Sequence, residues 1–441
     1  MRGFLASSIG VTCAAALALP LALPAAAAPT KAQARAAAQP TSGARSAPTA
    51  AEPDLPGSTQ SLPLTPTTRD RTLGAAPEQG LTRDDVHRFS LVGVTWTDPD
   101  TELRGRVQVR TRATGTGEWS GWQDVDTHNE DHGADPGTAE RDSGHVHGST
   151  APLWVGDSDA VDVRVRADRA ATRAVEPQAS ALPAGLHLEL VDPGAEPPPA
   201  VVRATARRAT VPPLAATELP ALSRAATERE AVTMYGRSQP YIGPRPRIIT
   251  RRGWGADEKL REKGFVYTKK VKAVFVHHTA SGNNYSCSQA PSVIRGIYRY
   301  HVESSGWRDI GYNFLVDKCG NIYEGRAGGV AKPVLGAHTL GFNTNSMGIA
   351  VLGTFGTAKP SSAAVTAIAR LSAWKLGLYG VNPRGKTYLK SGGGNLYRKG
   401  KNVRLNAISG HRDGFATECP GRQLYGKLGS ARSTSARFQG R

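Results

Sequence analysis

Long apolar runs are nearly absent from this sequence. Beyond the first 28 residues no segment approaches the ~20 continuous apolar residues that a membrane-spanning helix needs, so no membrane span is expected there. No internal repeat is evident in either half, and no Gly-x-Ser-x-Gly motif is present, which argues against a Ser-His-Asp hydrolase of the elbow type. The basic residues also lack a helix-turn-helix or aromatic-interleaved pattern, so a nucleic-acid binder is not favoured.

The N-terminus has the three-part layout of a secretory signal peptide. Arg2 is followed by the apolar stretch Phe4 to Leu23, and then by four alanines that end at Ala28. A membrane anchor is the alternative, but Pro20 and Pro24 interrupt the stretch and no basic stop-transfer cluster follows. We therefore predict that residues 1–28 are a signal peptide and that the protein is secreted.

Cysteine is scarce, with four residues in 441. Cys13 would leave with the signal peptide, so the exported chain keeps Cys287, Cys319 and Cys419. A disulfide is permitted outside the cell. An odd cysteine in a secreted protein indicates a reactive or metal-binding thiol.

Acidic residues are sparse in the C-terminal half. From residue 245 onward 9 Asp and Glu oppose 32 Lys and Arg, and the remainder of the totals of 37 and 55 leaves 28 against 23 before that point. The overall charge of +18 is thus the sum of a strongly basic second half and a slightly acidic first half. In an exported protein such a basic half favours anionic cell-wall polymers as partners. The alternative is that the charge only keeps the protein soluble.

Composition divides the chain into segments. Residues 29–80 are rich in Ala, Pro, Thr and Ser and predict a disordered leader, and residues 194–244 return to this composition as a Pro- and Ala-rich linker. Residues 81–193 form a β-rich domain, residues 245–430 an α/β domain, and residues 431–441 a flexible tail.

The β-rich domain is expected to be an antiparallel β-sandwich, because several short apolar or alternating segments are separated by Gly, Asp and Pro turns. These segments are Phe89–Trp96, Arg106–Arg112, Trp154–Val155, Val161–Arg166 and Leu186–Leu190. Trp119 and Trp122 would stack on a sugar ring, but core positions are the commoner role of tryptophan in a small sandwich. The same domain holds four histidines without recognisable metal-ligand spacing: His128, His132, His145 and His147. We interpret the domain as a cell-wall-binding or spacer module.

The α/β domain alternates apolar strands with helical patterns. Strands are expected at Lys272–Thr279, Tyr312–Asp317, Asn321–Glu324 and Ser346–Gly353. One helix is expected after Ser288, and a second begins near Ser361 and ends around Gly377 to Gly380. This mixture predicts one covered sheet.

Histidine and cysteine gather at the end of one strand and in the last loop. His277 or His278 closes the first strand, and His411 and Cys419 lie eight positions apart. Imidazole and thiolate suit Zn²⁺, and three protein ligands leave the fourth tetrahedral position open, which is the catalytic arrangement. Zinc in such a site acidifies a water and polarises an amide carbonyl. Spacing alone does not choose between the two neighbouring histidines, whose side chains point to opposite faces of the strand.

Six motifs in order resemble the peptidoglycan recognition protein and type-2 N-acetylmuramoyl-L-alanine amidase family, in a secreted bacterial, actinobacterial-like form. They are Arg252–Gly255, Val276–Ala280, Trp307–Phe314, Gly320–Arg326, Gly336–His338, and Gly410–Arg412 with Cys419–Gly421. The resemblance covers about residues 245–430. It implies a mixed β-sheet flanked by helices, a groove that binds the peptidoglycan stem peptide, and zinc at its bottom.

The resemblance also assigns roles to single residues. The zinc ligands would be His277, His411 and Cys419, with Tyr312 orienting the water or stabilising the oxyanion and Thr417 donating to the tetrahedral intermediate. His338, Arg326 and Asn343 match groove positions. Arg326 would pair with a stem carboxylate, and a structural salt bridge is its equal alternative.

With Cys419 as a ligand, Cys287 and Cys319 are left to form a disulfide. The implied activity is hydrolysis of the amide between the muramyl lactyl group and L-alanine, by a monomer associated with the cell wall. The alternative is a non-catalytic peptidoglycan receptor on the same fold. Such receptors typically lack the cysteine ligand, so Cys419 favours the enzyme.

Overall fold

The structure is a computed structural model that describes residues 57–67, 76–127, 131–168, 181–195, 216–236 and 240–441. These residues all belong to one compact unit. The predicted signal peptide, the leader up to residue 56, and His128 lie outside the described residues. Among the helices that are described, none has the length and apolarity to cross a bilayer.

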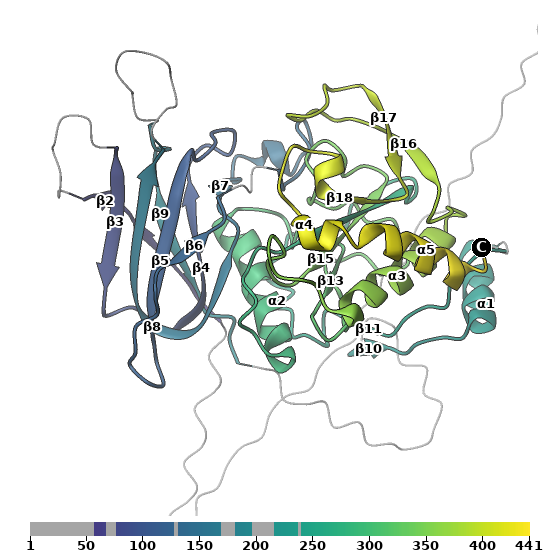
Figure 1. Cartoon of the computed structure of the whole chain (residues 1–441), viewed down its shortest axis with the longest axis horizontal. Helices are drawn as coiled ribbons and strands as arrows, with labels where there is room; N and C mark the ends of the chain where they lie inside the picture. The colour runs from purple at the N-terminus through teal and green to yellow at the C-terminus, as the bar shows by residue number, and fades with distance from the viewer. Residues whose placement is uncertain (1–56, 68–75, 128–130, 169–180, 196–215, 237–239) are drawn as a thin grey trace, which may run out of the picture. The chain divides into compact units, whose positions relative to one another are not determined.

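The N-terminal part of the described chain is built from antiparallel strands (Figure 1). They are β1 (Thr59–Pro63), β2 (Thr65–Pro66), β3 (Glu78–Arg83), β4 (Phe89–Trp96), β5 (Gly105–Ala113), β6 (Gln123–Val125), β7 (Gly148–Ser149), β8 (Leu153–Ala167) and β9 (His187–Val191). The long strand β8 joins two groups of strands, because its first residues pair with β4 and the rest lie between β3 and β5. Apolar residues from both groups meet in one core, including Val92, Val109, Val163 and Leu188. The prediction of a β-rich domain is therefore confirmed.

The predicted disordered leader is wrong at Thr59–Pro63 and Thr65–Pro66 and at its last residues from Glu78, because these residues form strands. Strand β1 pairs in register with β9, from Thr59 opposite Val191 to Pro63 opposite His187. The sequence of β1 has a single apolar side chain other than proline, Leu62. Its order comes from the ladder with a distant strand, which composition does not reveal.

The C-terminal part contains a mixed sheet with strand order β10-β11-β14-β13-β15-β12-β18. Its strands are β10 (Glu218–Leu219), β11 (Ile248–Ile249), β12 (Ala273–His278), β13 (Phe314–Val316), β14 (Ile322–Glu324), β15 (Ser346–Val351) and β18 (Ile408–Gly410), with a separate hairpin of β16 (Lys386–Lys390) and β17 (Asn402–Asn406). The helices are α1 (Arg224–Tyr235), α2 (Ala290–Arg299), α3 (Ser362–Gly377), α4 (Arg422–Tyr425) and α5 (Leu428–Gln439). Strand β12 runs parallel to both β15 and β18, whereas β13 and β14 are antiparallel. The predicted mixed sheet flanked by helices is confirmed.

Helices cover both faces of this sheet. Val274 and Val276 of β12 point into the cluster formed with α3 and α5, and Phe275 between them packs on the opposite side. Helix α3 begins where predicted, because the Ser361 side chain accepts a hydrogen bond from the Ala364 N–H. Because side chains alternate along a strand, His277 lies on the face of Phe275 and away from α3.

Two further predictions are corrected by helices. In the predicted linker, α1 is capped by Ser223 and buries Thr227 and Ala231. In the predicted flexible tail, α5 continues to Gln439, whose side-chain amide donates to the Ala373 carbonyl of α3 at 2.9 Å. Both helices are weakly apolar, and small residues pack them against their neighbours, so the local pattern carries little signal.

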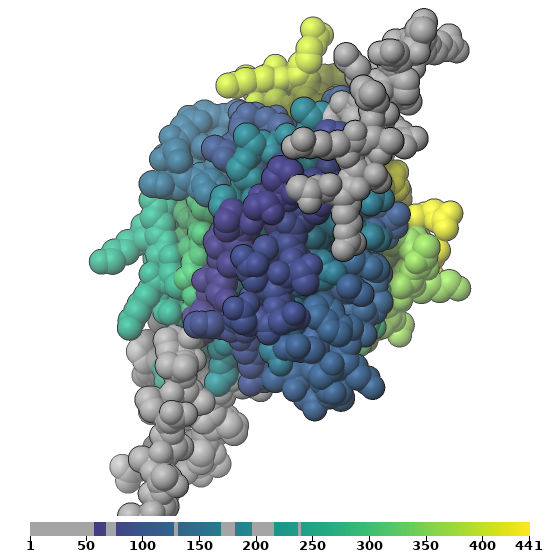
Figure 2. Space-filling view, turned by 90° about the vertical axis from the view of Figure 1, so that its left-hand side faces the viewer, coloured from purple at the N-terminus to yellow at the C-terminus, as the bar shows by residue number. Residues whose placement is uncertain are grey.

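The β-rich domain and α2 share a core. Leu91, Trp154 and Val191 cluster with apolar residues of α2 and of the following π-helical turn η4 (Tyr300–Ser304). The Tyr300 hydroxyl donates to the Thr150 carbonyl at 3.1 Å. Figure 2 shows the face that the β-rich domain, coloured purple to blue, presents to the viewer. A second cluster, of Ala134, Val146, Trp307 and Ala337, packs residues 131–147 against the C-terminal part of the chain.

Candidate metal centre

Two neighbouring parallel strands bring the first two predicted ligands together. His277 is the fifth residue of β12, and His411 directly follows β18. The two strands pair with Val276 opposite Gly410. The residues that follow these two, His277 and His411, are therefore neighbours. Cys419 comes from the loop before α4.

The ligand atoms of these three residues converge. His277 Nδ1 lies 3.0 Å from His411 Nδ1 and 3.7 Å from Cys419 Sγ. With zinc bonds of about 2.0–2.1 Å to nitrogen and about 2.3 Å to sulfur, a tetrahedral site separates two nitrogens by about 3.3 Å and nitrogen from sulfur by about 3.6 Å. The observed spacings therefore suit a zinc ion. All three side chains are buried, at 0% exposure for each histidine and 3% for Cys419.

His278 lies on the other face of β12 and is not part of this group. Its Nδ1 accepts a hydrogen bond from the Phe355 N–H at 3.3 Å. Of the pair that strand periodicity left open, His277 is the residue that the structure brings into the group, and its role as a metal ligand stays a prediction.

Burial shapes the electrostatics of the group. It lowers the pKa of His277, and it lowers the pKa of His411 to about 3 although Asp131 opposes the shift. Burial, followed by the charge of Asp131, raises the pKa of the Cys419 thiol. Both imidazoles are thus neutral and able to donate a lone pair, and a buried thiolate needs a cation beside it.

A hydrogen-bonded chain orients His277 from behind. His277 Nε2 lies 3.3 Å from the Thr339 hydroxyl, which lies 3.0 Å from His338 Nδ1. A partner on the outer nitrogen fixes the tautomer of a metal-ligating histidine and turns its other nitrogen toward the ion. His338, predicted to line the groove, is fully buried in this position. Thr339 was not predicted, because one hydroxyl after a histidine has no distinctive spacing.

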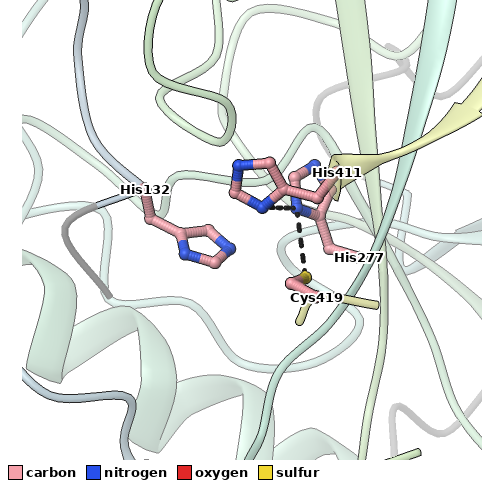
Figure 3. A group of neighbouring side chains, drawn as sticks. All are labelled: His132, His277, His411 and Cys419. Carbon is pink, nitrogen blue, oxygen red and sulfur yellow. Dashed lines mark hydrogen bonds between the residues drawn. The ribbon is translucent and has the colours of Figure 1, made fainter. Parts of the chain in front are cut away.

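A fourth side chain joins the group from the β-rich domain. His132, His277, His411 and Cys419 each offer one ligand atom, and these atoms all lie within 4.8 Å of one another (Figure 3). Asp131 Oδ1 lies 2.6 Å from His132 Nδ1. His132 Nε2 is buried and has no hydrogen-bond partner within the described part of the chain. The sequence around His132 has no ligand spacing, because its partners in the group lie far away along the chain.

Tyr312 and Thr417 line a small pocket beside the group, together with Asp126, His132 and Cys419. The Tyr312 ring lies 5.5 Å from that of His277, and burial, followed by Cys419, raises the pKa of its phenol. Thr417 Oγ1 accepts a hydrogen bond from the Cys419 N–H at 3.1 Å.

The other two predicted groove residues contact the β-rich domain. Arg326 forms an ion pair with Glu140, with both guanidinium nitrogens 2.8 Å from carboxylate oxygens. This is the salt bridge that the sequence analysis gave as the alternative. Asn343 donates to the Gly133 carbonyl at 2.9 Å and to Asp135 at 2.7 Å. A role in binding substrate stays a prediction for both.

Cys287 and Cys319 form a disulfide, and Cys419 is the free cysteine among the described residues. Trp119 and Trp122 are outside the core of the β-rich domain. The guanidinium of Arg110 lies over both rings, and that of Arg164 lies 4.0 Å from the centre of the Trp122 ring. Trp119 is 38% exposed. The sugar-stacking hypothesis for these tryptophans stays a prediction.

Comparison with known proteins gives matches to both parts of the chain. A family described as "Rv3811 N-terminal galactose-binding domain-like" matches residues 44–184, and a family described as "N-acetylmuramoyl-L-alanine amidase" matches residues 267–422. Peptidoglycan-recognition protein SC2 of Drosophila melanogaster is 31% identical over 183 residues, which is 41% of this chain and 84% of that protein. Peptidoglycan-recognition protein SC1a of the same organism is 33% identical over 187 residues, with 41% of this chain and 83% of that protein covered.

A solved structure of Drosophila PGRP-LB is 27% identical, with a TM-score of 0.33 over 42% of this chain and 92% of that one. The sequence matches cover most of the length of the recognition proteins. The amidase match spans strands β12 to β18 and contains His277, His411 and Cys419. The chain therefore belongs to the family of peptidoglycan recognition proteins and type-2 N-acetylmuramoyl-L-alanine amidases.

Proposed function

We propose that this protein is a secreted zinc-dependent N-acetylmuramoyl-L-alanine amidase, which hydrolyses the amide between the muramyl lactyl group and L-alanine of the stem peptide. The observation that carries the proposal is the convergence of His277 Nδ1, His411 Nδ1 and Cys419 Sγ at spacings suited to zinc. A recognition protein that only binds peptidoglycan has no need of these three ligands.

The three residues would hold Zn²⁺, which polarises the scissile carbonyl and supplies a nucleophile from water near neutral pH. The protein's own groups do the positioning. The Thr339 hydroxyl beside Nε2 would fix the tautomer of His277 and leave Nδ1 free to bind the metal. Burial keeps the Tyr312 phenol protonated, and a neutral phenol can donate a hydrogen bond to the oxygen on which negative charge develops. Thr417, at the edge of the same pocket, is the proposed second donor.

The cellular setting and the domain roles belong to the same proposal. Residues 1–28 would direct export, residues 245–430 would carry the amidase, and the protein would act as a monomer at the cell wall. The β-rich domain would serve as a cell-wall-binding or spacer module. The excess of basic residues after position 245 supports contact with anionic wall polymers.

The test combines metal analysis with product analysis. Purified protein is expected to hold one zinc per chain, and Cys419→Ser is expected to lose most of it. Peptidoglycan incubated with the protein is expected to release stem peptides with a free N-terminal alanine, identified by mass, and a chelator is expected to stop the release. Stem-peptide release by Cys419→Ser at the wild-type rate would contradict the zinc mechanism. Tight peptidoglycan binding without any release would favour the receptor.

A further inference from the structure

Residues 131–147 of the β-rich domain form a segment that lies against the candidate metal centre. We infer that His132 is a fourth metal ligand that closes this centre, and that the segment occupies the peptide groove and must withdraw before peptidoglycan binds. This inference rests on the proposed function, because it concerns the same metal and the same groove.

The position and the hydrogen bonding of His132 make it a candidate fourth ligand of the group. His132 is buried, with 8% of its surface exposed. Its ligand atom and those of His277, His411 and Cys419 all lie within 4.8 Å of one another (Figure 3). The Asp131 carboxylate on Nδ1 keeps the proton there, which leaves Nε2 with a lone pair. A carboxylate, a histidine and a metal in a row form the usual support of a zinc-binding imidazole. A buried Nε2 without a partner would otherwise cost free energy.

A fourth protein ligand changes what the centre can do. Three protein ligands leave a position for water or substrate, whereas four close a tetrahedral site. With His132 in place the site resembles a structural zinc site, made of three imidazoles and one thiolate. Withdrawal of His132 exchanges one imidazole for one water and alters no covalent bond.

The rest of the segment contacts two residues that the family resemblance assigns to the substrate groove, Arg326 and Asn343. Glu140 places its carboxylate on Arg326, where a stem-peptide carboxylate is expected. Asp135 accepts hydrogen bonds from the Gly341 N–H at 2.8 Å and from Asn343 at 2.7 Å. The segment therefore presents carboxylates to the groove as the stem peptide would.

Backbone hydrogen bonds fix the segment at both ends. The Leu340 N–H donates to the Asp131 carbonyl at 2.9 Å, and the Gly133 N–H donates to the Ala337 carbonyl at 3.3 Å. At the other end the His147 N–H donates to the Ser305 carbonyl at 3.1 Å. His132 is thus held in the group by its neighbours on both sides and is not a side chain that happens to lie nearby.

The test counts the imidazoles on the metal. Zinc-loaded full-length protein is examined by X-ray absorption at the zinc edge, where the outer-shell scattering of the ligand rings reports their number. Wild type is expected to show three imidazoles and one sulfur, and His132→Ala two imidazoles and one sulfur. Competition with a chelator is expected to give at least about a tenfold loss of zinc affinity in His132→Ala. His145→Ala is the matched control, since His145 is an exposed histidine of the same segment, and it is expected to behave as wild type.

Peptidoglycan digestion provides the second readout. His132→Ala is expected to release stem peptides at least about tenfold faster than wild type, the change that follows when a competent fraction below one tenth rises to near one. Glu140→Ala, which leaves His132 intact, is expected to accelerate release in the same direction and serves if His132→Ala does not fold. The inference would be overturned if the zinc of the wild type were bound by only two imidazoles. It would also be overturned if wild type, His132→Ala and Glu140→Ala released stem peptides at equal rates. A third result separates the two proposals. If wild type shows three imidazoles and His132→Ala two, but no variant releases stem peptides, the closed centre is supported and the amidase is refuted.

Discussion

The ion pair between Arg326 and Glu140 offers a direct measure of how firmly the 131–147 segment is attached. Its two side chains are 4% and 6% exposed, and two 2.8 Å contacts join them. The Glu140→Ala substitution removes the carboxylate and leaves the guanidinium with backbone carbonyls alone, of which Ile310 O is nearest at 2.9 Å. The prediction is that this change loosens the segment and leaves the rest of the fold intact.

The magnitude follows from the burial of the pair. Breaking a buried ion pair by removing one partner costs about 3–5 kcal/mol, because the other charge stays buried without compensation. In Glu140→Ala, water can hydrate the guanidinium of Arg326 again if the segment detaches. The cost therefore falls on attachment of the segment instead of on global unfolding. Since about 1.4 kcal/mol corresponds to a factor of ten, the opening equilibrium of the segment should rise by roughly two to three and a half powers of ten.

Hydrogen exchange followed by mass spectrometry measures this opening at two backbone amides. The Leu340 N–H is bonded to the Asp131 carbonyl and the Gly341 N–H to the Asp135 carboxylate, so both lose protection when the segment leaves. Their exchange should accelerate by the factor above in Glu140→Ala. Glu118→Ala, at an exposed glutamate of the same domain, should leave it unchanged.

Two results would refute the reasoning about Glu140. Acceleration below about threefold would mean that the ion pair contributes nothing to attachment. Equal acceleration in the strand amides of β12 would mean that the pair stabilises the whole fold. The double variant Arg326→Met with Glu140→Ala should exchange more slowly than Glu140→Ala alone, because it leaves no buried charge behind.

Three further outcomes are expected. Tyr312→Phe, made in the His132→Ala background, should lower kcat for stem-peptide release by about 10²- to 10³-fold with zinc content unchanged, the usual loss for one oxyanion donor; an unaltered kcat would remove Tyr312 from the mechanism. Replacing Cys287 and Cys319 by serine should lower the free energy of unfolding by about 3–4 kcal/mol in urea titrations, since the loop they close spans 32 residues, and should spare zinc content. Burial lowers the pKa of Lys375 to about 7, so the unfolded chain binds one more proton than the native chain between that pH and about 10.4. The free energy of unfolding should therefore rise with pH across this window, and the rise should be smaller in Lys375→Met; an equal slope in both proteins would contradict the assignment.

The apolar strands and the capped helix were predictable because each carries its own pattern. Strand β4 matches its predicted bounds, and α3 begins at Ser362, next to its predicted start near Ser361. The segments that were missed depend on distant partners instead. Strand β1 is ordered by pairing with β9, and α5 by small side chains that fit against α3. Local composition contains neither piece of information.

The candidate site shows the same division. His277 could be predicted because a histidine pair ends an apolar strand, and His411 and Cys419 because both lie in the last loop. The family resemblance then favoured His277 over His278. His132 escaped notice because it lies 145 positions before His277 in a loop with no ligand spacing of its own. A signal was present in the adjacent Asp131, since a carboxylate beside a histidine often supports a metal ligand.

The uneven charge along the chain also gains an internal explanation. The basic excess after residue 245 was interpreted as a surface for anionic polymers, and the slightly acidic first half received no role. In the structure three acidic residues of that first half contact the C-terminal part: Asp131 lies beside His411, Asp135 accepts from the Gly341 N–H, and Glu140 pairs with Arg326. These contacts are buried, and buried pairs are screened far less by salt than exposed ones. Added salt should therefore do little to release the segment. A stem peptide, in contrast, brings carboxylates of its own to the same donors and competes for them directly, so in this arrangement the substrate itself is the better suited agent of opening.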